Sequence, residues 1–152
     1  MDIKAFLKDY PFLSAEILRL QKELNTALKA RKDTYITVKA APLAMHRGSS
    51  GISDSVSDAV QIIVDRLEND IAFYVRQINI ILDQKAMFEK IWFGQELLSK
   101  AERTILEMRH FDHYPWPTIA KTVRYSERQC QRLNEMAIEK MQTEADRLTL
   151  TA

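Results

Sequence analysis

The chain has 152 residues, a net charge of +1 and only three glycines and four prolines, while helix-forming residues such as Leu, Ala, Glu, Lys and Arg dominate. This composition predicts an all-α protein. A single cysteine excludes an internal disulfide, and no apolar run reaches the length of a membrane span. We therefore expect a cytoplasmic protein without a membrane partner.

The first predicted helix covers residues 11–32. Pro11 suits a first helical position, where a missing N–H costs nothing. Apolar residues then recur at steps of four and three, at Leu13, Ile17, Leu20, Leu24 and Ala27 or Leu28. This spacing is typical of the seam of packed helices. Basic residues near position 32 complement the carbonyl end of the helix dipole, which predicts an end near Asp33.

Residues 33–53 are expected to form a connecting loop. They begin with a β-branched run around Ile36, and Pro42, Gly48 and Gly51 interrupt any regular element. The segment 45–48 carries a Met, a His and an Arg that a binding loop could use, but a solvated linker is the favoured interpretation.

A second helix is predicted over residues 54–92, capped by Ser53. Its apolar stripe continues for nearly forty residues, with an apparent stutter where Ile63, Leu67 and Ile71 follow at two steps of four. Because so long a stripe needs a partner, residues 1–93 are predicted to form an antiparallel helical hairpin. The pattern leaves open whether the hairpin also pairs with a second copy of the chain.

Residues 94–98, beginning with Gly94, are predicted to be a hinge that leads to a three-helix domain over residues 99–141. Ser99 with Glu102 and Ser126 with Gln129 have the spacing of capping boxes, each marking a helix start. Between them lie a short helix after Pro115 and a turn at Arg124. A helix, a short helix, a turn and a longer helix describe a helix-turn-helix domain. The polar tail, 142–152, is expected to fray.

The last predicted helix has a polar face that suits DNA. Cys130, Leu133, Ala137 and Met141 form its core stripe, which leaves an outer set suited to base recognition: Glu127, Arg128, Gln131 and Arg132. In a major groove, Arg pairs with guanine, Gln pairs with adenine, and Glu accepts a hydrogen bond from cytosine. The expected phosphate contacts are Lys121, Arg124 and the start of the helix at Ser126.

These motifs also resemble a known family. The segment SKAERTILEMRHF at 99–111, Trp116 with Ile119 and Ala120, YSERQ at 125–129 and AIEKM at 137–141 resemble the sigma-70 region 4-like domain of phage RinA/ArpU-type late transcriptional regulators. Residues 49–65 resemble the segment upstream of that domain. The chain departs from the family pattern at Pro115, Pro117 and Arg124, where Ser, Glu and Gly are usual. The resemblance implies a late-gene activator that acts with RNA polymerase.

The sequence carries no nucleophilic triad, phosphate loop or paired-carboxylate motif, so we expect neither an enzyme nor a bound cofactor. His110, Asp112, His113 and Cys130 are metal-type ligands, but their spacing does not suit a metal site. The expected function is sequence-specific DNA binding in transcription regulation, with double-stranded DNA as partner. Two alternatives stay open: a small terminase-like packaging subunit, and a helical adaptor that contacts only protein.

Overall fold

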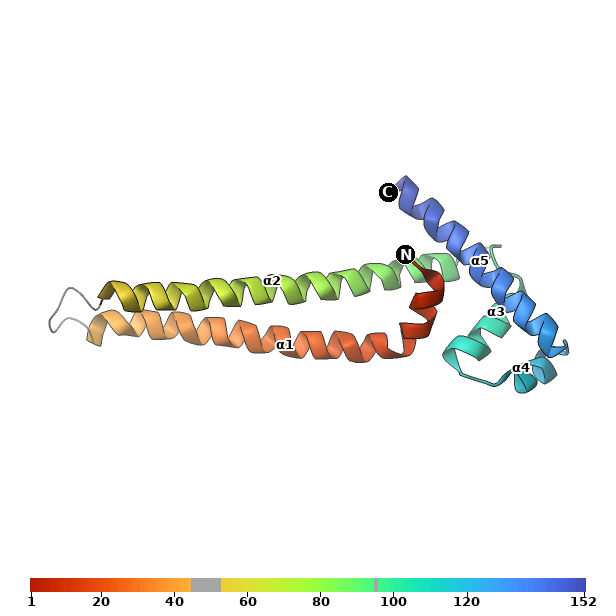
Figure 1. Ribbon diagram of the computed structural model, residues 1–152, viewed down its shortest axis with the longest axis horizontal. Helices are drawn as coiled ribbons and strands as arrows, with labels where there is room; N and C mark the ends of the chain where they lie inside the picture. Colours follow the sequence, from red (N-terminus) through yellow and green to blue (C-terminus); the bar gives the residue numbers. More distant parts are fainter. Residues whose placement is uncertain (45–52, 95) are drawn as a thin grey trace. The chain divides into compact units, whose positions relative to one another are not determined.

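The computed structural model describes residues 1–44, 53–94 and 96–152, and every regular element within these ranges is helical. The elements are α1 (Ile3–Ala44), α2 (Ser53–Trp92), α3 (Lys100–Leu106), the π-helix η1 (Glu107–Phe111), α4 (Trp116–Val123) and α5 (Glu127–Thr151). Figure 1 shows α1 and α2 side by side and antiparallel, which confirms the predicted all-α fold with its hairpin. None of the helices in the described ranges combines the length and hydropathy needed to cross a membrane.

The helices fold into two compact units, and their division differs from the predicted one. One unit is the hairpin, residues 15–81. The other combines residues 1–14 with residues 82–152, so it contains the start of α1 and the end of α2 as well as all later helices. We call these the hairpin unit and the C-terminal unit.

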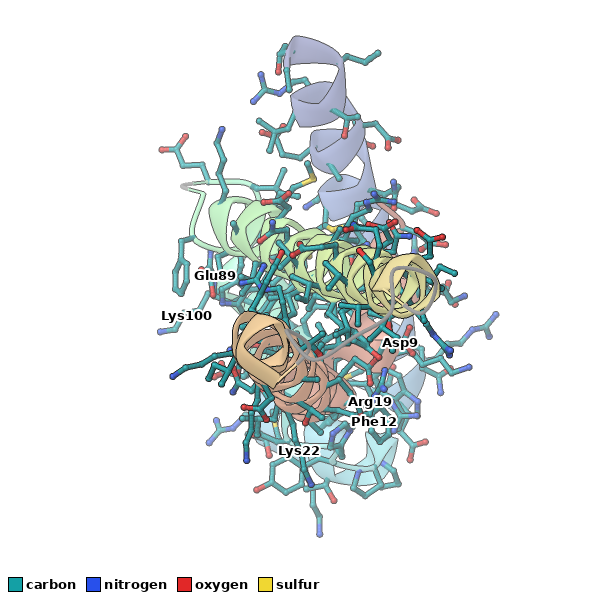
Figure 2. The ribbon with its side chains drawn as sticks, turned by 90° about the vertical axis from the view of Figure 1, so that its left-hand side faces the viewer. Asp9, Phe12, Arg19, Lys22, Glu89 and Lys100 are labelled. Atoms are coloured by element: carbon teal, nitrogen blue, oxygen red, sulfur yellow. The ribbon has the colours of Figure 1, made fainter. Side chains whose placement is uncertain are left out.

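The seam of α2 in the hairpin unit is regular. Val64 is 8% exposed, whereas the predicted seam residue Ile63 is 51% exposed. With Val64 in place of Ile63, the steps from Val60 through Leu67 and Ile71 alternate between four and three, so the predicted stutter is wrong. Because positions 62–64 are all apolar, the sequence alone does not tell which of them faces α1. Packing against α1 selects Val64. Figure 2 looks along this pair of helices, with side chains spread around both.

Helix α1 ends at Ala44, twelve residues beyond the predicted end at 32, so the predicted loop is wrong for residues 33–44. The heptad spacing continues at two polar, partly buried residues. Arg31 donates to both carboxylate oxygens of Glu68, at 3.2 and 3.3 Å, and Thr34 Oγ1 donates to the Ala30 carbonyl at 2.8 Å. Packing along this continued seam thus keeps the β-branched run helical in spite of its weak helix propensity. Residues 45–52 of the predicted loop, including 45–48, lie outside the described residues, and Ser53 is the first residue of α2.

Helix α1 also begins earlier than predicted, at Ile3 instead of Pro11. The Asp2 carboxylate accepts from the Ala5 amide at 3.0 Å, which caps the first turn. Pro11 lies inside the helix, where it removes one backbone hydrogen bond. The apolar residues that precede it, Ile3, Phe6 and Leu7, are buried in the core of the C-terminal unit.

The main core of the C-terminal unit joins residues from both ends of the sequence. Its buried members come from the start of α1, the end of α2, the following segment, α3 and α5: Ile3, Phe6, Leu7, Phe88, Ile91, Leu98, Leu106, Ala137, Met141 and Ala145. The Gln142 side chain forms two hydrogen bonds with the N-terminal backbone. Its oxygen accepts from the Ile3 amide at 2.9 Å, and its nitrogen donates to the Met1 carbonyl at 3.0 Å.

Two predicted boundaries therefore need correction. Residues 94–98 are not a hinge between domains, because the residues on both sides belong to one unit and Leu98 is buried. The predicted polar tail is helical to Thr151, and Ala145 within it is fully buried. The physical reason is the same in both cases: the start of α1 supplies an apolar surface that these segments cover.

Candidate nucleic-acid interface

An ion pair between Glu102, whose side chain is buried, and the partly exposed Lys140 links α3 to α5. Ser99 and Glu102 form the predicted capping box, with the Glu102 amide donating to the Ser99 hydroxyl and the Ser99 amide donating to the Glu102 carboxylate. The same carboxylate accepts from Lys140 Nζ at 2.7 and 2.9 Å. Burial opposes ionisation of Glu102, but the hydrogen bonds from Lys140 and Ser99 outweigh it and hold its pKa below the ordinary value.

The turn between α4 and α5 follows the predicted course. Pro115 is the N-cap of α4 and Pro117 lies in its first turn, where a proline is tolerated. Arg124 adopts the left-handed conformation, with φ 61° and ψ 36°, and its amide donates to the Ala120 carbonyl. Ser126 and Gln129 then form the second capping box, at the start of α5. The predicted sequence of helix, turn and helix is confirmed.

A small second core holds this turn together. Ile105 of α3, Ile119 of α4 and Cys130 of α5 are each fully buried there, and Trp116 and Leu133 pack against them. Cys130 is thus a core residue, and burial raises the pKa of its thiol. Because three helices meet at these side chains, the first turns of α5 are held on a rigid base.

The four residues predicted to contact bases lie on one exposed side of α5. Glu127, Arg128, Gln131 and Arg132 are exposed, and the opposite side of the helix carries the buried Cys130. Arg128, Gln131 and Arg132 form no side-chain hydrogen bond or ion pair with any residue that the structure describes. Their guanidinium and amide groups are therefore free to meet a ligand.

The structure separates the predicted phosphate contacts into exposed basic side chains and a serine that belongs to a capping box. Lys121 and Arg124 are exposed. Ser126 is exposed too, but its amide donates to Gln129 Oε1 at 3.0 Å, while its hydroxyl accepts from the Gln129 amide at 3.2 Å and lies 3.1 Å from Oε1. Ser126 is thus already engaged within the capping box. The first-turn amides outside this box belong to Glu127 and Arg128, and these are better placed to donate to a phosphate.

A partly buried polar pair joins the segment before α4 to α5. His110, in η1, lies 2.9 Å from the Asn134 side-chain oxygen of α5. Burial lowers the pKa of His110, and the neighbouring charges of Arg109 and His113 lower it further, against the effect of the Asn134 hydrogen bond. Among the described residues, no three His, Cys, Asp or Glu side chains gather to hold a metal ion.

This pair predicts a pH-dependent stability. With its folded-state pKa below that of the unfolded chain, His110 binds more protons when unfolded, so its contribution to stability is present above pH 6.5 and lost as pH falls. We expect His110→Gln, which keeps a polar group near Asn134 but does not titrate, to reduce the loss of unfolding free energy between pH 7 and pH 5. Urea unfolding across this range measures it, and identical pH profiles for the two proteins would contradict the assignment.

Sequence reasoning missed a second basic group in the C-terminal unit. Lys4 and Lys8 of α1 line a hollow together with Arg109, His110 and His113. The spacing of four between the two lysines was a signal, since it places them on one side of a helix. Their neighbours in the fold could not be foreseen while the start of α1 was assigned to the hairpin.

None of the protein families, curated proteins and solved structures compared with this chain matches it. The resemblance to phage late regulators therefore stays a prediction from the motifs at 99–141.

Proposed function

We propose that the protein is a sequence-specific DNA-binding transcription regulator. The observation that carries the proposal is the exposed side of α5, where Arg128, Gln131 and Arg132 have no partner among the described residues. Here the free donors gather in the first two turns, immediately after the turn of a helix-turn-helix.

In this proposal, the start of α5 enters the major groove. Arg128 and Arg132 donate to guanine, Gln131 pairs with adenine, and Glu127 accepts from cytosine or orients Arg128. Lys121, Arg124 and the first-turn amides of α5 hold phosphates on either side, which fixes the register of the helix on the duplex.

The resemblance to phage late regulators extends the proposal to a late-gene activator acting with RNA polymerase in the bacterial cytoplasm, close to the nucleoid. A single helix-turn-helix makes few base contacts, so useful affinity needs a second binding surface. RNA polymerase or a second copy of the chain would provide it.

Equilibrium binding to duplex DNA across a range of salt concentrations tests the proposal. The logarithm of the binding constant should fall linearly with the logarithm of salt concentration. Lys121→Ala should weaken binding to all sequences alike and reduce the slope by about 0.9, because one phosphate contact is lost. Binding to no duplex at any salt concentration would refute the proposal. An effect of Lys121→Ala confined to one DNA sequence would refute the role given to this residue.

A packaging subunit is the second candidate, and the outer surface of the hairpin favours it. Ile63, Phe73 and Ile80 on α2 are each about half exposed, at 51%, 51% and 45%, and apolar residues on the outside of a hairpin suit assembly. Solution mass distinguishes the two candidates. A large closed ring would support packaging, whereas a monomer or dimer would support regulation.

A further inference from the structure

A basic hollow lies in the C-terminal unit, separate from the predicted DNA-contacting residues. Its volume is about 430 Å³, and it is lined by Lys4, Leu7 and Lys8 of α1 and by Arg109, His110 and His113 from η1 and the segment after it. Five of these six side chains carry or can carry a positive charge, and none is an Asp or a Glu. Leu7 is fully buried.

The lysines and the arginine that line this hollow form no ion pair with any residue that the structure describes. Lys4 and Lys8 are exposed and form no ion pair with any residue in the described ranges. The Arg109 guanidinium contacts uncharged groups, since it donates to the Tyr114 carbonyl at 3.2 Å and lies 4.7 Å from the centre of the Trp116 ring. Lys4 also lines a neighbouring hollow that contains Asp2, Glu139 and Asp146, so carboxylates lie near it on that side. The basic hollow itself has no carboxylate in its lining, and an anion bound there would relieve the mutual repulsion of its cationic groups.

The hollow adjoins the start of α4. Trp116, whose ring Arg109 covers, is the first residue of that helix, and His113 and Tyr114 lead directly into it. In helix-turn-helix proteins the first helix of the motif crosses the DNA backbone. The basic residues that line the hollow therefore lie next to the helix that would cross the DNA backbone.

We propose that this hollow binds a backbone phosphate of the DNA duplex, with Lys4, Lys8 and Arg109 as its cationic groups. The inference rests on the proposed function and adds a contact outside the helix-turn-helix. It also gives the packing of residues 1–14 within the C-terminal unit a role in binding, because that packing brings Lys4 and Lys8 to the same hollow as Arg109. The contact is independent of DNA sequence, as all backbone contacts are.

The test compares two double variants of the full chain. Lys4→Ala/Lys8→Ala should weaken binding to every duplex by roughly 5- to 30-fold at 0.15 M salt and lower the salt slope by about 0.9 to 1.8, about 0.9 for each lost contact. Lys22→Ala/Lys29→Ala is the matched control, because those lysines line a hollow of the same 430 Å³ volume in the hairpin unit. Lys22 is labelled in Figure 2. The control variant should have the DNA affinity and the salt slope of the wild-type chain.

The outcomes separate this inference from the proposed function. If the wild-type chain binds DNA and the two double variants have the same affinity and salt slope, the phosphate site is refuted while the proposed function stands. If the wild-type chain binds no DNA, the proposed function is refuted, and the phosphate site is refuted with it. Lysine-dependent binding of inorganic phosphate without any effect on DNA affinity would identify a site for a free anion and would also overturn the inference. Circular dichroism of each variant verifies that the fold is kept.

Discussion

Replacing Phe88 by alanine should destabilise the C-terminal unit by about 3–5 kcal/mol, the range for a large aromatic removed from a core. Phe88 is 3% exposed, and its ring centre lies 4.9 Å from that of Phe6, 5.8 Å from Tyr10 and 6.1 Å from Phe111. The substitution leaves a cavity where α1, α2 and η1 meet, and the surrounding helices are too constrained to fill it.

Tryptophan fluorescence during urea unfolding measures this loss selectively, because both tryptophans of the chain, Trp92 and Trp116, belong to the C-terminal unit. Phe93→Ala is the matched control: Phe93 lies five residues further on, is 72% exposed, and should change the unfolding free energy by less than about 0.5 kcal/mol. Equal, small effects for the two variants would mean that the end of α2 is not part of this core.

Arg128→Ala should cost about 1–3 kcal/mol of binding free energy at a single base-pair position, which is roughly 5- to 150-fold in affinity, and should relax the preference there. The guanidinium has no partner among the described residues, so its removal leaves no buried group unpaired in the free protein. The whole loss should therefore appear in the complex. Binding to a preferred duplex and to duplexes substituted at each position measures it.

Arg147→Ala is the matched control on the same helix. Arg147 lies near the other end of α5, where it pairs with Glu144 at 2.6 Å, and its removal should leave DNA affinity unchanged. If Arg128→Ala weakened binding to all duplexes equally, Arg128 would be a backbone contact. If Arg147→Ala had the same effect as Arg128→Ala, the assignment of the interface to the start of α5 would be wrong.

The helix-turn-helix was predictable because its signals are local. Each capping box lies within four residues, and the structure contains both, at Ser99 and at Ser126. Arg124 occupies the position where glycine is usual and has the positive φ that the turn requires. Local hydrogen bonds and steric limits act between near neighbours, so a single sequence records them.

The organisation of the C-terminal unit was not predictable in the same way. The contact between Ile3 and Gln142 joins residues 139 positions apart, and no periodicity within either helix reveals it. Similarly, Ile63 and Val64 are equally apolar, so only packing against the partner helix selects Val64 for the seam. The basic hollow depends on the same long-range packing, because Lys4 and Arg109 become neighbours only when the start of α1 joins the later helices.

Selection of bound sequences from a random pool of duplex DNA tests the central claim, that residues 127–132 recognise bases. The wild-type chain should enrich one motif, and Arg128→Ala should enrich the same motif with one position relaxed. Enrichment of no motif by the wild-type chain, or an unchanged motif for the variant, would contradict the claim.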